Sequence, residues 1–187
     1  MGRLFWVVMT LFIAAASHIT YVLFEPGLMF QKKLYALSSA KPDNSFFILP
    51  HEEQSQLFPI ATANDVVGVC KYDLDAGRVV LSAKLPRSYW TVSIYTDSGT
   101  QIYALDDVQA GSNSFTVDLT RAKTLLQQLL AKNDGEDGGQ IENLGWKVES
   151  TERRGLAVIW VPLSDALMRG GVEDTIRESD CKVKASQ

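Results

Sequence analysis

The stretch that decides the fold is residues 66–107, VVGVCKYDLDAGRVVLSAKLPRSYWTVSIYTDSGTQIYALDD. Its apolar and polar residues alternate in short runs, and turn-forming groups such as Asp75-Ala76-Gly77 separate the runs. Alternation with a period of two is typical of strands with one buried face, and Gly, Asp and Pro mark the turns between such strands. The pattern therefore predicts a β-meander of four consecutive antiparallel strands.

One short strand and a loop are expected before the meander. Residues 46–49 are apolar and predict a strand that Pro50 ends. Residues 51–63 are rich in Gln, Glu, Ser and Pro, a composition that predicts an irregular surface loop.

A strand, a helix and a second hairpin are expected after the meander. Residues 114–117 predict the strand, and Asp118 or Thr120 is expected to cap a helix whose leucine stripe covers the sheet. Residues 146–150 and 156–161 predict the hairpin.

The last element is expected to be a helix. Ser164 or Asp165 can cap it, and it runs to about Asp180, so that Cys181 follows it directly. All these elements together predict an α+β fold, mainly β. An N-terminal transmembrane helix precedes an antiparallel β-meander or sandwich-like domain with one or two covering helices.

Residues 4–24 predict a single transmembrane helix. They contain no formally charged residue, and at about 1.5 Å rise per residue they span the ~30 Å hydrocarbon core of a bilayer. Trp6 and Tyr21 lie near the two ends, where amphipathic rings favour the interface. The Glu-Pro-Gly sequence at residues 25–27 is expected to stop the helix.

A cleaved signal peptide is the competing interpretation, with a cleavage-like site at Ala14-Ala15-Ala16. Apolar residues continue to Phe24, however, where a mature N-terminus usually turns polar, so a retained anchor is preferred.

The flanking charges are nearly balanced between Arg3 on one side of the span and Lys32 and Lys33 on the other. We expect the domain outside the cytoplasm, because the anchor resembles an export signal and a large C-terminal domain translocates largely regardless of its charge. The expected organisation is an anchor with a short cytoplasmic tail at 1–25, a juxtamembrane amphipathic helix and linker at 26–45, and a β-rich extracytoplasmic domain at 46–187.

The net charge limits which classes of partner are expected. With 18 basic and 22 acidic residues the chain has a formal net charge of −4, which argues against nucleic acid as a partner. The lipid bilayer is an expected partner because of the hydrophobic span at residues 4–24. The two His and two Cys residues show no metal-ligand spacing, so no metal or cofactor is expected. His18 within the span is either a proton-handling group or a neutral imidazole.

Cys70 and Cys181 are the candidates for a disulfide. A bond between them would close a ring of about 110 residues and stabilise the fold by roughly 4 to 5 kcal/mol on loop-closure entropy. The alternative is that Cys70 is a nucleophile with His51 as its base, which also requires a third orienting group.

Aromatic and acidic residues of the meander define a candidate ligand cleft. Its members are Tyr89, Tyr95, Tyr103, Asp106 and Asp107. The alternative is cross-strand aromatic packing for the tyrosines and ordinary turn chemistry for the carboxylates.

Residues 133–139, NDGEDGG, predict an acidic surface loop, with calcium binding as the alternative. They lack the spacing of a twelve-position calcium loop.

Three motifs of the meander carry a resemblance to a known family. Residues 69–77 (VCKYDLDAG), 89–95 (YWTVSIY) and 101–107 (QIYALDD) resemble the small bacterial membrane proteins called domain of unknown function 1254. The resemblance implies a β-rich domain, a membrane location and a companion protein of the domain of unknown function 1214 family. It implies no reaction. The chain departs from the pattern at residues 133–139 and at Gly170-Gly171.

The sequence leads to a hypothesis of function and an alternative. The hypothesis is a single-pass protein of the bacterial inner membrane with its C-terminal domain in the periplasm, acting as a non-enzymatic interaction or assembly module of the envelope. The alternative is an envelope enzyme or small-ligand-binding protein that uses the aromatic and carboxylate cleft.

Overall fold

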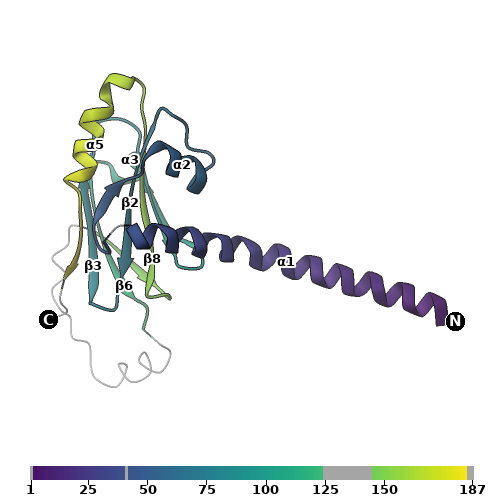
Figure 1. The fold of residues 1–187 in the computed structure, drawn as a ribbon. Helices are drawn as coiled ribbons and strands as arrows, with labels where there is room; N and C mark the ends of the chain where they lie inside the picture. Colours follow the sequence, from purple (N-terminus) through teal and green to yellow (C-terminus); the bar gives the residue numbers. More distant parts are fainter. Residues whose placement is uncertain (1, 41, 124–144, 185–187) are drawn as a thin grey trace, which may run out of the picture.

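A computed structural model describes residues 2–40, 42–123 and 145–184, and it confirms the α+β, mainly β fold class. One long helix leaves a β-sandwich (Figure 1). The helices are α1 (Gly2–Ala40), α2 (His51–Leu57), α3 (Asp107–Ala110), the 3-10 turn η1 (Ala166–Met168) and α5 (Arg169–Arg177). The strands are β1 (Phe46–Ile48), β2 (Asp65–Asp73), β3 (Arg78–Lys84), β4 (Thr91–Thr96), β5 (Gln101–Asp106), β6 (Ser114–Arg121), β7 (Trp146–Ser150), β8 (Arg154–Pro162) and β9 (Asp180–Lys184).

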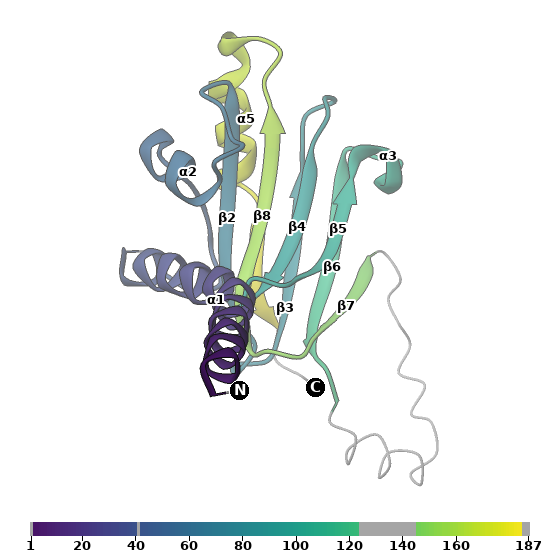
Figure 2. The same cartoon turned by 90° about the vertical axis from the view of Figure 1, so that its right-hand side faces the viewer.

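The strands form two sheets. The five-stranded sheet has the order β1-β2-β8-β4-β5, with every neighbouring pair antiparallel. The four-stranded sheet has the order β7-β6-β3-β9, in which β6 and β7 are parallel. Figure 2 shows the broad five-stranded sheet with α1 and α2 against it.

The predicted meander is correct in its strands and wrong in their pairing. Only β4 and β5 form a hairpin, whereas β2 and β3 belong to different sheets. The burial pattern explains the separation. Eight of the nine residues of β2 are buried, so both of its faces are covered, while β3 alternates and buries only one face.

The predicted hairpin of residues 146–161 does not form. β7 pairs with β6 in one sheet, and β8 lies between β2 and β4 in the other. Residues 151–153 carry the chain from one sheet to the other, and β8 is buried on both faces from Gly155 to Ile159. A strand that is buried on both faces lies inside a sheet that is covered on both sides. A local two-stranded hairpin does not provide this cover.

The main core lies between the sheets and is closed on one side by α5. Val172 and Ile176 of α5 join this core. Gly68 of β2 makes the approach of α5 possible, because a Cβ there would lie 2.3 Å from Ile176 Cγ2. Small residues in strands often mark such a close approach.

The predicted disulfide is present. Cys70 of β2 is bonded to Cys181 of β9, and the bond therefore ties one sheet to the other. Cys181 lies in a strand that sequence reasoning missed, because α5 ends at Arg177 and β9 begins at Asp180. Asp165 does act as a cap, but of η1.

The predicted end of the membrane helix is wrong. α1 continues through Pro26 to Ala40 without a break. A proline inside a helix removes one backbone hydrogen bond at a cost of about 3 kcal/mol. Packing of Phe30 and Leu34 on the sheet beyond the proline offsets this cost.

Two further expectations also fail. Residues 51–57 form α2 instead of a loop, with Glu52 and Glu53 in the first turn, where carboxylates favour a helix. Asp118 and Thr120 lie inside β6 and cap no helix there. The leucine stripe after them and residues 133–139 lie outside the described residues.

Candidate functional site

The outer face of the five-stranded sheet, opposite the core, is the candidate site. Strand register places side chains on this face in three rows across β2, β8 and β4. The rows are Val67, Trp160 and Thr91, then Val69, Val158 and Ser93, and then Lys71, Leu156 and Tyr95. Because most of these residues are apolar, the face must be covered, and α1 and α2 cover it.

The C-terminal part of α1 packs on this face. The rings of Phe30 and Tyr95 have centroids 6.0 Å apart, and Leu34 is only 7% exposed. Phe30 also lies against the turn between β4 and β5, where a Cβ on Gly99 would be 2.9 Å from Phe30 Cγ. α1 and the β-sandwich are therefore joined by side-chain packing as well as by the chain.

α2 covers the neighbouring part of the face. Lys33 Nζ of α1 donates a hydrogen bond to the backbone carbonyl of Gln56, which ties the two helices together. Gln54 is buried, and its Nε2 donates to the carbonyl of Leu49 at 2.7 Å. Leu57 and the following Phe58 pack against the sheet.

An apolar cavity of about 230 Å³ remains between the α2–β2 segment and the sheet. Val67, Val158 and Trp160 contribute to its lining from the sheet, and Phe58 and Ile60 from the segment after α2. Thr91, Ser93 and Tyr95 add hydroxyl groups, and no charged residue is among the described residues that line it. The cavity is thus suited to an uncharged, largely apolar group.

A larger, charged cleft of about 490 Å³ lies beside it. This cleft lies between α1, the C-terminal end of β2 and the N-terminal end of β8. Its lining includes Lys71, whose side chain is 4% exposed and whose ammonium lies 3.1 Å from the carboxylate of Asp43. Arg154 Nε donates to Asp73 Oδ2 at 2.6 Å. These two ion pairs hold the segment between α1 and β1, and the first residue of β8, against β2.

Tyr72 closes the floor of that cleft. Its hydroxyl donates to the backbone carbonyl of Tyr95 at 2.9 Å, and burial raises its pKa to about 12. A phenol with this pKa stays protonated and keeps the hydrogen bond at neutral pH.

The five residues of the candidate cleft fall in different places. Tyr95 lines the apolar cavity on the outer face. Tyr103 pairs in register with Ile94 and packs against the core on the opposite face, where burial raises its pKa. Tyr89 precedes β4 and is 50% exposed.

The two carboxylates of that candidate cleft lie at the start of α3. Asp106 Oδ1 caps α3 by accepting from the backbone N–H of Gln109 at 2.7 Å, which is turn chemistry. Asp107 is the first residue of α3, and its backbone N–H donates to the carbonyl of Trp90.

The nucleophile alternative for Cys70 is wrong. Its sulfur is bonded to Cys181 and fully buried, so it supplies no thiolate. His51 begins α2 on the outer side of the sheet and is exposed.

Sequence reasoning missed Trp160 and residues 57–61 as site residues. The only sequence signals are a tryptophan within the apolar run of β8 and an apolar Leu-Phe-Pro-Ile sequence inside a segment otherwise rich in polar residues. Neither signal says that the two meet, because the pairing of Val67 with Trp160 joins distant parts of the chain.

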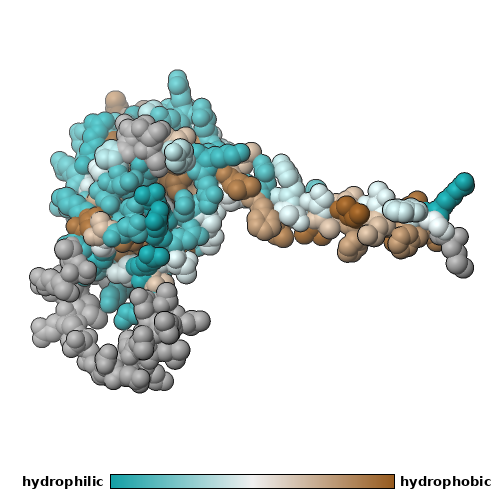
Figure 3. All heavy atoms as spheres, turned by 60° about the horizontal axis from the view of Figure 1, so that its bottom comes forward, coloured by the Kyte–Doolittle hydropathy of each residue, from teal (hydrophilic) through white to brown (hydrophobic). Residues whose placement is uncertain are grey.

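Within the part of the chain that the structure describes, one helix is long and apolar enough to cross a membrane, over Gly2–Ala36. A signal sequence near the N-terminus has the same properties. Large hydrophobic side chains such as Leu4, Phe12 and Leu23 are exposed along it. Figure 3 shows that this helix is largely hydrophobic, whereas the visible face of the domain is largely hydrophilic.

The fold is similar to that of a solved bacterial protein. The VPA0106 protein from Vibrio parahaemolyticus matches 88% of this chain, with a TM-score of 0.58 and 10% sequence identity, and this chain covers 40% of that protein. An uncharacterised protein from Burkholderia cenocepacia matches 66% of this chain, with a TM-score of 0.42 and 12% identity, over 32% of its length. No family model and no curated protein match the sequence. At these identities the likeness concerns the fold alone.

Proposed function

We propose that this protein is a single-pass protein of the bacterial inner membrane, with α1 as a retained anchor and the β-sandwich in the periplasm. It acts as a non-enzymatic binding module within a membrane assembly. The proposed partner is a companion membrane protein of the domain of unknown function 1214 family.

The observation that carries the proposal is the docking of α1 on the sheet. α1 is continuous from its membrane-length segment to Phe30 and Leu34, which pack on the outer face. A domain held in this way has a restricted orientation relative to the bilayer. A binding surface for a membrane partner benefits from such restriction, because less orientational freedom is lost when the complex forms.

The Cys70–Cys181 bond supports the periplasmic location. Disulfides form and persist in oxidising compartments such as the periplasm and are rare in the cytosol.

The test uses two glycine variants of the full-length protein in its native membrane. Gly99→Ala places a Cβ against Phe30 at a residue whose φ is +85°. Gly111→Ala is the matched control, because its φ is +61° and no heavy atom lies within 4 Å of the added Cβ. Both substitutions strain the backbone, but only the first disturbs the docking of α1.

The measurement is cross-linking in the membrane, followed by detergent solubilisation and quantification of co-purifying proteins by mass spectrometry. We expect a stoichiometric membrane partner with the wild-type protein and with Gly111→Ala, and a clear loss with Gly99→Ala. If the wild-type protein carries no stoichiometric partner, the assembly role is wrong. A partner retained equally by both variants would show that α1 docking does not present the binding surface.

A further inference from the structure

The apolar cavity beside α2 has the chemistry of a lipid-chain site. We propose that it takes one hydrocarbon chain of a lipid from the surrounding bilayer. The inference goes beyond the proposed assembly role, and it requires α1 to cross the bilayer but requires no protein partner.

The lining selects for an uncharged chain. Leu57, Phe58, Val67 and Val158 supply apolar contacts, and the described lining residues contain no Lys, Arg, Asp or Glu. An alkyl chain gains free energy in such a cavity by leaving water, whereas an ionised group would lose its hydration without a counter-charge.

The cavity lies on the side of the domain from which α1 leaves. α1 leaves the domain from the outer face of the five-stranded sheet, and α2 with the loop after it lies on that same side (Figure 1). Ile60 lines the cavity and is nevertheless 82% exposed, so an apolar side chain stands at its open edge. A lipid chain can therefore enter from the membrane side, where its local concentration is greatest.

The size of the cavity limits the ligand to part of a chain. An apolar cavity of about 150 Å³ admits benzene. The volume of about 230 Å³ thus holds a somewhat larger group, such as a short stretch of alkyl chain. Most of the lipid would remain in the bilayer.

The test uses the full-length protein in nanodiscs of phosphatidylcholine that contains a photoreactive diazirine on one acyl chain. After irradiation, mass spectrometry locates the adducts on the protein. We expect adducts on the peptides that carry Phe58 and Trp160, in addition to those on the spanning part of α1. The same probe with a phosphatidylglycerol head is expected to react equally, because no cationic side chain is among the described lining residues.

Two cavity-filling variants report on the site from opposite sides. Val158→Phe fills the cavity from the sheet, and Ala61→Leu fills it from the α2–β2 segment. We expect each to lower adduct formation at the cavity about tenfold, as excluding about two methylene groups would do. Val80→Phe on the outer side of the four-stranded sheet is the matched control and is expected to change nothing.

Retention of the disulfide and of the thermal unfolding midpoint shows that each variant is folded. Adducts confined to α1, adducts unchanged by both filling variants, or a strong preference for the anionic head would each overturn the proposal.

Discussion

The ring of Phe30 in α1 lies against the ring of Tyr95 in β4, with centroids 6.0 Å apart. This contact links α1 to the strand that forms part of the cavity wall. On the other side of Tyr95, its backbone carbonyl accepts the hydrogen bond of the Tyr72 hydroxyl at 2.9 Å. Tyr95 therefore connects α1, the apolar cavity and the charged cleft.

Removing the Phe30 ring is expected to weaken the packing of α1 on the sheet. A fully buried Phe→Ala change costs about 3 to 5 kcal/mol, and Phe30 is only half-buried, so we expect Phe30→Ala to lower the free energy of unfolding by about 2 kcal/mol. Denaturant titration of the full-length protein in detergent micelles measures the change. Phe12→Ala is the control, because Phe12 is 69% exposed in the same helix. Equal effects of the two variants would contradict the docking.

The packing of α5 is tested by two glycines with opposite expectations. Gly68→Ala places a Cβ 2.3 Å from Ile176 Cγ2, and such overpacking typically costs 1 to 3 kcal/mol. Gly171→Ala in α5 meets no atom within 4 Å and is expected to stabilise by about 0.5 to 1 kcal/mol, because alanine favours the helix. Thermal unfolding followed by circular dichroism measures both. A neutral Gly68→Ala would mean that α5 packs elsewhere.

Loss of the disulfide is expected to be the largest single destabilisation. Cys70 and Cys181 are separated by 111 positions, and opening a ring of that size costs about 4 to 5 kcal/mol on loop-closure entropy. A Cys70→Ala and Cys181→Ala double variant should therefore unfold at much lower denaturant, as should the reduced wild-type protein. Mass mapping under non-reducing conditions provides the independent check, and free thiols in protein from native membranes would contradict the periplasmic location.

The ion pair of Asp73 predicts a pH-dependent contribution to stability. Burial raises the pKa of Asp73, but the N–H of Asp75 and the guanidinium of Arg154 lower it more, so the net pKa is below its usual 3.8. A carboxylate with a depressed folded-state pKa stabilises the fold above its unfolded-state pKa and loses this effect as pH falls through the folded-state value.

The stability difference between wild type and Asp73→Asn should accordingly be constant above about pH 5 and shrink below pH 4. Urea titrations from pH 3 to pH 7 measure it. Asp75→Asn, on an exposed residue with longer ion pairs, serves as the comparison. A difference that does not change with pH would rule out this role for Asp73.

The extent to which the sequence predicts this structure depends on how local each signal is. The β4–β5 hairpin can be predicted because Asp97-Ser98-Gly99 joins two adjacent runs of alternating apolar and polar residues. The membrane-length helix can be predicted from hydrophobicity alone. The disulfide is predictable because only two cysteines are present.

The pairing of β2 with β8 could not be predicted, because the two strands are far apart in the sequence and no local pattern in either strand specifies its partner. The continuation of α1 beyond Pro26 and the formation of α2 depend on packing against the sheet, which overrides local propensity. The cavity follows from these two misjudged elements, and Trp160 was therefore missed as part of a site.

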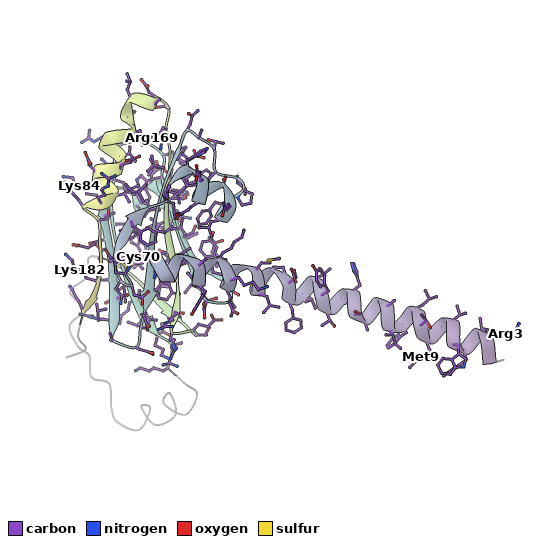
Figure 4. The ribbon with its side chains drawn as sticks, in the orientation of Figure 1. Arg3, Met9, Cys70, Lys84, Arg169 and Lys182 are labelled. Carbon is purple, nitrogen blue, oxygen red and sulfur yellow. A yellow bond between two sulfur atoms is a disulfide. The ribbon has the colours of Figure 1, made fainter. Side chains whose placement is uncertain are left out.

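The central claim is that α1 fixes the outer face of the five-stranded sheet towards the bilayer. Figure 4 shows Lys84 and Lys182 on the side of the domain away from α1. A fluorophore on Ile60→Cys, beside the cavity, should therefore lie close to the headgroup region, and one on Lys84→Cys should lie far from it. The native cysteines are bonded to each other, so only the introduced thiol reacts.

The decisive measurement is quenching of these two fluorophores by lipids that carry a nitroxide on the headgroup, with the full-length protein in nanodiscs. The structure predicts strong quenching at position 60 and little at position 84. Equal quenching at the two positions, or stronger quenching at 84, would contradict the claim that this face is turned towards the membrane.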